Sequence, residues 1–228
     1  YISNVGESTE KPFDIISVPL AAIGFGGLVY ALSDIETLMA GSFVPIIVGV
    51  AAIIALIAFV LRQLSLGKSD QAFLDLRVFA VPGFAIAIIL VMVIFGLLLG
   101  LVTVLPIYLQ KAILVTTAVS GLVVMPGGLL QGLAAPFIGR LYDRVGVRPL
   151  MIPGIILVAI STGLLTWAAY QRFGPIAMAM LYVLFEVGIA LAITPLYTAS
   201  LSSLPAHLYS HGSATLSTAQ QLASAIGV

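Results

Sequence analysis

The feature that most constrains this chain is a run of 32 residues, 78–109, without a single charged side chain. As one α-helix this run would be about 48 Å long at 1.5 Å per residue, whereas the hydrocarbon core of a bilayer is about 30 Å thick. Side chains of this kind are stable in lipid rather than in water. We therefore expect a membrane-spanning helix here, with Pro82 and Pro106 marking its ends.

Similar apolar runs recur along the whole chain and predict an all-α transmembrane fold of six spanning helices plus the start of a seventh. The last run carries small residues four apart, at Ala219, Ala223 and Gly227, which is typical of a close-packing helix face. The expected spans are residues 15–32, 43–61, 82–106, 116–138, 149–169 and 177–201, with a seventh beginning at 212.

Composition excludes several classes of protein. The chain is 61% hydrophobic and 8% charged, whereas soluble domains carry about 25% charged residues. Its net charge of zero gives no reason to expect nucleic acid as a partner. There is no Cys and only two His, so we expect no cofactor and no metal site, although His207 and His211 are four residues apart. Because the chain opens without Met and stops inside an uncharged run, we expect a piece of a longer protein.

Charge is concentrated in the short loop between the fourth and fifth spans. Arg140, Asp143, Arg144 and Arg148 fall within nine residues, and these three Arg are a third of the nine Lys and Arg in the chain. Loops on this side of the membrane hold seven Lys or Arg, against two on the other side. Cytoplasmic loops are enriched in Lys and Arg, so we expect the Asp143 loop to be cytoplasmic in a multi-pass protein of the plasma (inner) membrane.

The same loop carries a recognisable pattern. It resembles the loop signature of the major facilitator superfamily, G-x-L-x-D-R-x-G-R-R-x-L, and departs from it at Val147, where that family usually has a basic residue. The matching positions are Gly139, Leu141, Asp143, Arg144, Gly146, Arg148 and Leu150.

Other segments resemble one branch of this superfamily, the fourteen-helix drug:proton antiporters of the EmrB/QacA type. These are residues 74–79 (LDLRVF), 106–110 (PIYLQ), 125–128 (MPGG), Ala135-Pro136, and Leu204-Pro205 followed by residues 212–214 (GSA). The resemblance implies that residues 1–77 hold an extra helix pair and a cytoplasmic linker between two bundles. It also implies that residues 78–228 are the C-terminal six-helix bundle, truncated, and that an N-terminal six-helix bundle is missing.

The loop invites a mechanical interpretation. A carboxylate at the end of one helix can meet the positive N-terminus of the next helix and pair with Arg144 or Arg140. Gly139 and Gly146 would let the backbones approach. We expect Asp143 and its arginines, including Arg148, to form a latch that holds one face of a transporter shut. The alternative is that these charges only set the topology.

Glu186 is the one acidic residue expected inside a span. A carboxylate at the bilayer centre costs about 2.5–3.5 kcal/mol on insertion scales, and protonation would remove most of that cost. A proton-coupling or substrate-binding site needs a group of this kind. The alternative is a structural carboxylic acid that hydrogen-bonds a neighbouring helix.

Five further polar residues are candidates for lining a transport cavity, although Tyr at span ends is commonly an interface anchor. The cavity candidates are Tyr108, Gln110, Gln131, Tyr182 and Tyr197.

The resemblance implies a secondary active transporter rather than an enzyme, exchanging protons for amphipathic or cationic drug-like compounds across the lipid membrane. An exporter of another small solute (siderophore, amino acid or metabolite) and a non-transporting sensor remain alternatives.

Overall fold

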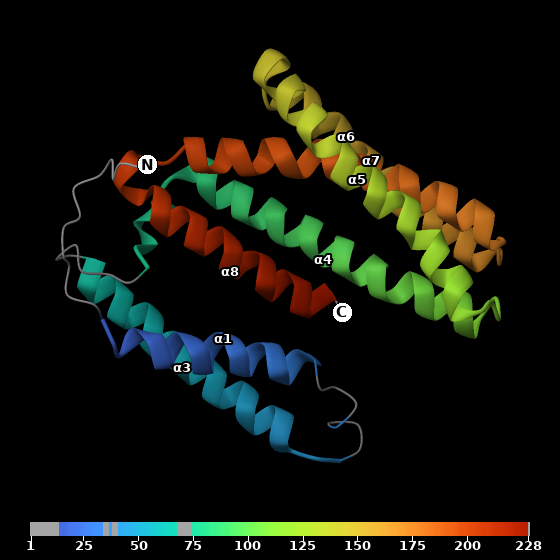
Figure 1. Ribbon diagram of the computed structural model, residues 1–228. Coiled ribbons are helices and arrows are strands. Elements are labelled where there is room, and N and C mark those ends of the chain that lie inside the picture. The colour runs from blue at the N-terminus through green and yellow to red at the C-terminus, as the bar shows by residue number, and fades with distance from the viewer. Residues whose placement is uncertain (1–13, 34–36, 38–40, 68–73, 228) are drawn as a thin grey trace, which may run out of the picture. The chain divides into compact units, whose positions relative to one another are not determined.

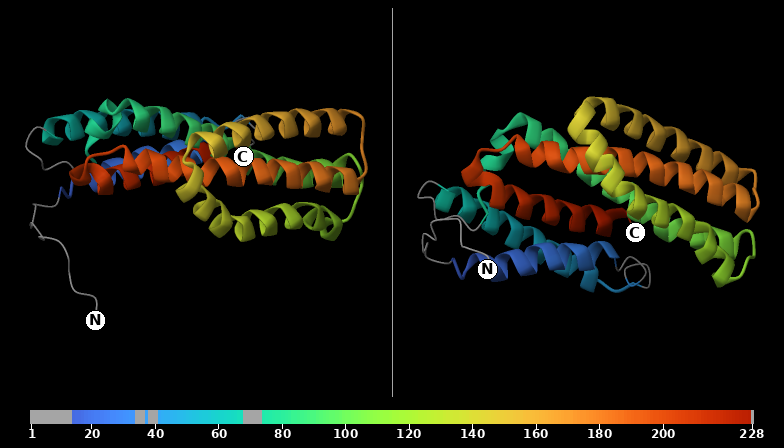
Figure 2. Two further views of the ribbon diagram at one scale, coloured as in Figure 1. Left: turned by 90° about the horizontal axis from the view of Figure 1, so that it is seen from above. Right: turned by 45° about the horizontal axis from the view of Figure 1, so that its top comes forward.

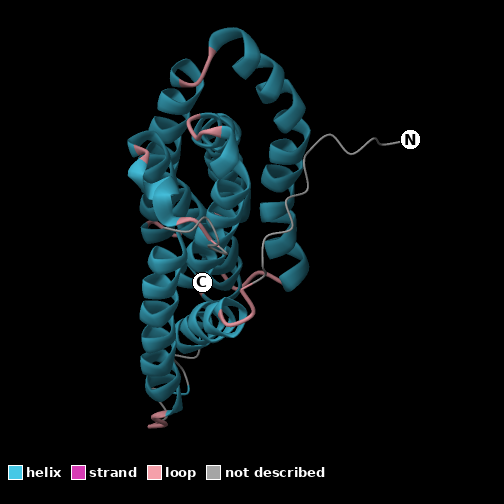
Figure 3. Cartoon of the chain, turned by 90° about the vertical axis from the view of Figure 1, so that its left-hand side faces the viewer, coloured by secondary structure: helices cyan, strands magenta, loops and turns pink. Residues whose placement is uncertain are grey.

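The computed structural model describes residues 14–33, 37, 41–67 and 74–227. Helices and loops account for these residues, and none of them is in a strand (Figure 3). The chain divides into two compact units, Tyr1–Ala80 and Val81–Val228, which are described separately.

In the second unit the helices follow one another with short connections (Figure 1). The first unit contains α1 (Ser17–Ser33), α3 (Val44–Gly67) and the short 3₁₀ helix η1 (Leu76–Ala80). The second unit contains α4 (Pro82–Lys111), α5 (Thr117–Val145), α6 (Arg148–Tyr170), α7 (Pro175–Ser202), the 3₁₀ helix η2 (Ala206–Leu208) and α8 (Tyr209–Gly227).

Five of these helices, α3 to α7, are long and apolar enough to cross a membrane. Helix α1 is also apolar, but with 17 residues it is shorter than the others. Helix α8 has 19 residues and corresponds to the partial seventh helix. The predicted all-α transmembrane fold is therefore confirmed.

The prediction that Pro106 ends the third span is wrong. Pro82 lies in the first turn of α4, where its missing N–H costs no hydrogen bond, but Pro106 lies inside this helix, which continues to Lys111. Proline is tolerated within membrane helices because neighbouring groups satisfy the freed carbonyl. The 30 residues of α4 make it about 45 Å long, so it must tilt or extend beyond the hydrocarbon core.

In the first unit, α1 and α3 pack closely through small residues. A side chain added at Gly24 would come within 2.8 Å of the Leu56 side chain, and one added at Gly27 would come within 3.0 Å of the Ala52 Cβ. The Phe25 and Phe59 rings meet edge to face with their centroids 6.1 Å apart. The two glycines thus allow an approach that a larger residue would prevent.

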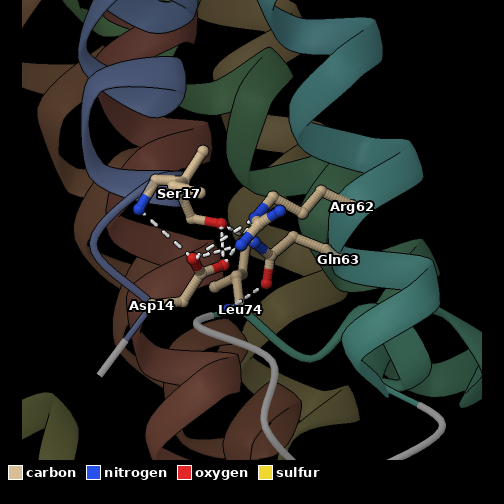
Figure 4. Close-up of polar contacts among 6 residues, drawn as sticks. Asp14, Ser17, Arg62, Gln63 and Leu74 are labelled. Atoms are coloured by element: carbon tan, nitrogen blue, oxygen red, sulfur yellow. Dashed lines mark hydrogen bonds and ion pairs between the residues drawn. The ribbon is translucent and has the colours of Figure 1, made fainter. Parts of the chain in front are cut away.

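One end of this pair is held by a buried polar network (Figure 4). The Arg62 Nη2 donates to the Asp14 carboxylate at 2.8 Å, and the Ser17 hydroxyl also donates to that carboxylate. The Gln63 amide donates to the Ser17 Oγ at 2.6 Å and accepts from the backbone N–H of Leu74 at 2.9 Å. The network therefore joins the start of α1, the end of α3 and the segment that follows α3.

In the second unit, α7 occupies the central position and packs against α4, α5 and α6. Eleven of its residues are buried, from Met178 to Ser200. Consecutive helices α5 and α6 contact α7 far more than they contact each other. Helix α5 follows a curved path (Figure 2) and contains Pro126 and Pro136, residues that typically bend helices.

Glycine allows α6 and α7 to approach at the level of their backbones. A side chain added at Gly154 would lie 3.0 Å from the carbonyl oxygen of Gly188, and one added at Gly188 would lie 3.0 Å from that of Gly154. The predicted small-residue face of α8 is also confirmed, since Ala219 and Ala223 are buried and a side chain added at Gly96 would lie 3.5 Å from the Ala223 carbonyl oxygen.

Candidate functional site

Glu186 lies near the middle of α7 and is 1% exposed. Its Oε2 atom has no hydrogen-bond partner among the residues that the structure describes. The ion pairs found in this part of the chain join Arg62 to Asp14 and Arg77 to Asp75, so Glu186 has no cationic partner there. It is a buried acid that lacks the charge needed to stabilise a carboxylate.

The immediate neighbour of Glu186 is Tyr182, one helical turn earlier on α7. Tyr182 is 1% exposed, and its side chain interacts with the Glu186 carboxyl group. The Tyr182 ring stacks on Phe185 with the centroids 6.0 Å apart. Tyr182, Phe185 and Glu186 are all buried, so the carboxyl lies in an enclosed part of α7.

Helix α5 closes the same site from the opposite side through Gly127. The position of this residue in the segment 125–128 (MPGG) was noted in the sequence, but no role was predicted for it. A glycine whose missing side chain makes room for a distant carboxyl leaves no signal in a single sequence. The structure is needed to identify it.

Gln131 and Tyr197 lie near one cavity. The cavity has a volume of about 320 Å³ and lies between α4, α5 and α7, with Gln131, Phe95 and Thr194 among the residues that line it. The Tyr197 ring meets Phe95 edge to face with the centroids 6.4 Å apart, and its buried hydroxyl has no hydrogen-bond partner within the described residues. These side chains offer hydrogen bonds rather than charge.

Tyr108 and Gln110 form hydrogen bonds with residues of neighbouring helices. The Tyr108 hydroxyl donates to the carbonyl oxygen of Ala169 at 2.8 Å and so joins α4 to α6, and Tyr108 also lines a separate cavity of about 220 Å³. The Gln110 amide donates to the Ser120 Oγ at 2.9 Å and accepts from the Thr117 hydroxyl at 3.2 Å. Gln110 therefore holds the end of α4 to the start of α5.

The turn between α5 and α6 has the tight geometry that its glycine predicts. Gly146 has φ 80°, a value that side chains rarely tolerate, and its N–H bonds the Tyr142 carbonyl at 2.8 Å. Asp143, Arg140, Arg144 and Arg148 are all exposed.

The pair that would define the latch is not formed in this conformation. Over the described residues, the Asp143 carboxylate makes no ion pair with Arg140 or Arg144 and no hydrogen bond to the start of α6. The sequence places these charges in one turn, but the structure leaves them facing outward.

The described residues contain no cluster of three or more His, Asp or Glu that would hold a metal ion. The arrangement around Glu186 is suited to taking up and releasing a proton, since it offers a shielded carboxyl with an unsatisfied oxygen. The cavity beside Gln131 is suited to a small, largely apolar molecule with hydrogen-bonding groups.

Residues 15–228 match the family model of the Major Facilitator Superfamily. The chain is 37% identical to the lincomycin resistance protein LmrB of Listeria monocytogenes over all of this chain and 47% of that protein. It is 33% identical to LmrB of Bacillus subtilis, with the same coverage of both chains. It is 28% identical to the multidrug export protein EmrB of Haemophilus influenzae, over 99% of this chain and 44% of that protein.

The chain thus spans about half the length of the curated relatives it matches. These relatives are resistance and export proteins rather than enzymes, and the predicted resemblance to the EmrB type is confirmed. The apolar helices, the loop signature and the family match over residues 15–228 agree, and the chain belongs to the Major Facilitator Superfamily.

Proposed function

We propose that this chain is part of a secondary transporter that exports drug-like compounds in exchange for protons, with Glu186 as the proton-carrying group. The observation that carries the proposal is the burial of Glu186 within α7, with one carboxyl oxygen unpartnered among the described residues. An acidic side chain in a membrane span is costly and is commonly part of a proton relay.

The surroundings of Glu186 favour a proton over a bound substrate cation. The carboxyl is enclosed by Tyr182 on α7 and by Gly127 on α5, and it does not line the cavity beside Gln131. A proton needs no additional volume, whereas a drug-sized cation does. The cavity, with its amide, hydroxyl and aromatic side chains, fits the apolar and hydrogen-bonding part of an amphipathic substrate.

The whole transporter would be about twice the length of this chain, in line with its relatives. In our proposal residues 1–77 provide the extra helix pair and linker, and residues 78–228 belong to the C-terminal bundle. An N-terminal six-helix bundle of the same protein would complete the transport pathway. The loop around Asp143 would be the latch, and the exposed, unpaired state of Asp143 would be its released state.

The names of the relatives suggest the first compound to test. LmrB is a lincomycin resistance protein, so lincomycin is a reasonable first substrate for the full-length protein in proteoliposomes. We expect uptake into inverted vesicles when a pH gradient is imposed and loss of that uptake when a protonophore is added. Lincomycin transport that is unaffected by both treatments would contradict proton coupling. Absence of lincomycin transport would leave an exporter of another small solute and a non-transporting sensor as the alternatives, which the same assay with other solutes separates.

The orientation is testable at the two ends of α6, because the sequence contains no native Cys. In our proposal the protein lies in the plasma (inner) membrane with the Asp143 loop in the cytoplasm. The cysteine of Val147→Cys should then not be labelled by an impermeant thiol reagent added outside the cell. A cysteine in Gln171→Cys, which is exposed at the other end of α6, should react. The reverse labelling pattern would overturn the proposed orientation.

A further inference from the structure

Gly127 faces the Glu186 site directly. A Cβ atom added at Gly127 would lie 2.8 Å from the Cγ of Glu186 and 2.8 Å from two ring carbons of Tyr182. Real Cβ atoms essentially never approach other heavy atoms this closely. The missing side chain at Gly127 therefore sets how near α5 can come to the buried carboxyl.

The neighbouring glycine provides an internal contrast. Gly128 is exposed, and a Cβ atom added there would meet nothing within 4 Å. The same holds for Gly132, one turn later. Of Gly127, Gly128 and Gly132, Gly127 alone is in close contact with α7. Its role is therefore specific to this contact and does not follow from a general need for small residues.

Pro126 lies inside α5 and directly precedes Gly127. A proline inside a helix removes one backbone hydrogen bond and commonly bends the helix. The backbone of α5 is therefore less constrained beside the residue that contacts Glu186 than in an uninterrupted helix.

We infer that Gly127 is a positioning residue that allows α5 to lie over the Glu186 carboxyl and shield it, so that movement of α5 controls access to that carboxyl. The inference rests on the proposed role of Glu186 in proton coupling for its functional meaning. Its structural content is separate: α5 covers the carboxyl at residue 127 and at no other glycine of the MPGG segment.

The test uses purified full-length protein and dicyclohexylcarbodiimide, an apolar reagent that modifies protonated carboxyl groups. Labelling of Glu186 is measured by mass spectrometry of the peptide that contains it. In Gly127→Ala the added methyl holds α5 away from α7, and we expect labelling to rise about tenfold, which corresponds to about 1.4 kcal/mol in the closing equilibrium. Gly128→Ala is the matched control and should label at the wild-type rate. Equal labelling of the two variants would overturn the inference.

A second pair of variants covers the case in which Gly127→Ala folds poorly. In a Tyr182→Ala background the ring that meets the added methyl is absent, and only the close contact with the Glu186 Cγ remains. Gly127→Ala should then cause a smaller loss of thermal stability and a smaller rise in labelling than in the wild-type background, because residues in contact give non-additive effects. Fully additive effects would contradict the contact between α5 and α7 at this point.

These readouts separate the two proposals. If Glu186→Gln keeps wild-type proton release while the labelling contrast between Gly127→Ala and Gly128→Ala persists, the proposed function fails and the positioning role stands. If the contrast is absent while Glu186→Gln abolishes proton release, the positioning role fails and the proposed function stands.

Discussion

Two acids with little exposed side-chain surface, Asp14 in the first unit and Glu186 in the second, show how differently a membrane protein can accommodate a carboxyl group. Asp14 is 7% exposed at the side chain and is held by Arg62 and by the Ser17 hydroxyl. Glu186 is 1% exposed and has Tyr182 as a neighbour but no cation within the described residues. The first acid has a cation that stabilises its ionised form, whereas the second has none among the described residues.

In our proposal this difference separates a structural acid from one that exchanges protons. The Arg62 guanidinium, and then the Ser17 hydroxyl, hold the pKa of the Asp14 carboxyl well below its usual range. Asp14 therefore keeps one charge state at any physiological pH and serves to join α1 to α3. A group that carries protons must instead be able to adopt both states within the transport cycle. In our proposal Glu186 meets this requirement, because no ion pair holds it ionised within the part of the chain that the structure describes.

The largest expected effect comes from removing the titration at Glu186. Glu186→Gln keeps the shape and some hydrogen bonding but cannot lose a proton, so we expect efflux driven by a pH gradient to fall to background for cationic and neutral compounds alike. Glu186→Asp should retain partial activity. Transport of single compounds of each charge class in proteoliposomes checks this. Loss for cations alone would show instead that Glu186 binds the substrate.

A third acid, the exposed Asp143, extends the comparison to a carboxylate outside the membrane core. If the latch pairs it with arginine or with the start of α6 in the closed state, Asp143→Asn should slow transport about tenfold, the factor expected from one charge-assisted hydrogen bond. Gly146→Val should cause similar damage, because φ 80° at this position is strained for any branched side chain. Membrane insertion should stay normal, since Lys and Arg rather than Asp set topology.

The control for these loop variants is the amount of protein in the membrane, measured beside the transport rate. Wild-type rates in both Asp143→Asn and Gly146→Val would reduce the loop to a topology signal.

The smallest effect is expected from Arg62→Gln, which makes Asp14 resemble Glu186 by removing its cation. We expect the thermal unfolding midpoint of the full-length protein to drop by a few degrees, with transport per folded molecule unchanged. Asp14→Asn should be milder, since the amide can still accept hydrogen bonds from Arg62 and Ser17.

The sign of the pH dependence follows from the depressed pKa of Asp14. Its contribution to stability is present above the ordinary Asp value of 3.8 and is lost as the pH falls below that value toward the lowered folded value. In Arg62→Gln this acid-dependent loss should be smaller, because the pKa is no longer depressed by the guanidinium. Unfolding curves measured from about pH 6 to about pH 3 provide the test. Identical acid profiles for wild type and Arg62→Gln would contradict the account of Asp14.

The number, order and approximate ends of the helices were predictable because apolar runs, Pro82 and the charged loops mark them directly. Pro106 was wrongly expected to end a helix, because helices in lipid tolerate an internal proline more readily than soluble helices do. The Asp14–Arg62 pair was missed, although both residues were expected on the same side of the membrane at the ends of adjacent spans.

Glu186 was identified because an isolated acid in an apolar run is visible in sequence. Its enclosure by Gly127 was not predictable, because that contact joins residues 59 positions apart on helices that are not consecutive. The expected pair of Asp143 with Arg140 or Arg144 depends on conformation, so spacing alone does not decide it. Sequence thus indicated candidate groups, and packing revealed which of them are shielded.

The most direct test of the central claim is proton release on substrate binding. Lincomycin is added to purified full-length protein in weakly buffered detergent solution, and the pH change is followed with an indicator dye for wild type and for Glu186→Gln. We predict that wild type releases protons in proportion to the substrate bound, and that Glu186→Gln binds substrate and releases none. Equal release from both proteins would show that another acid carries the proton and would contradict the role assigned to Glu186.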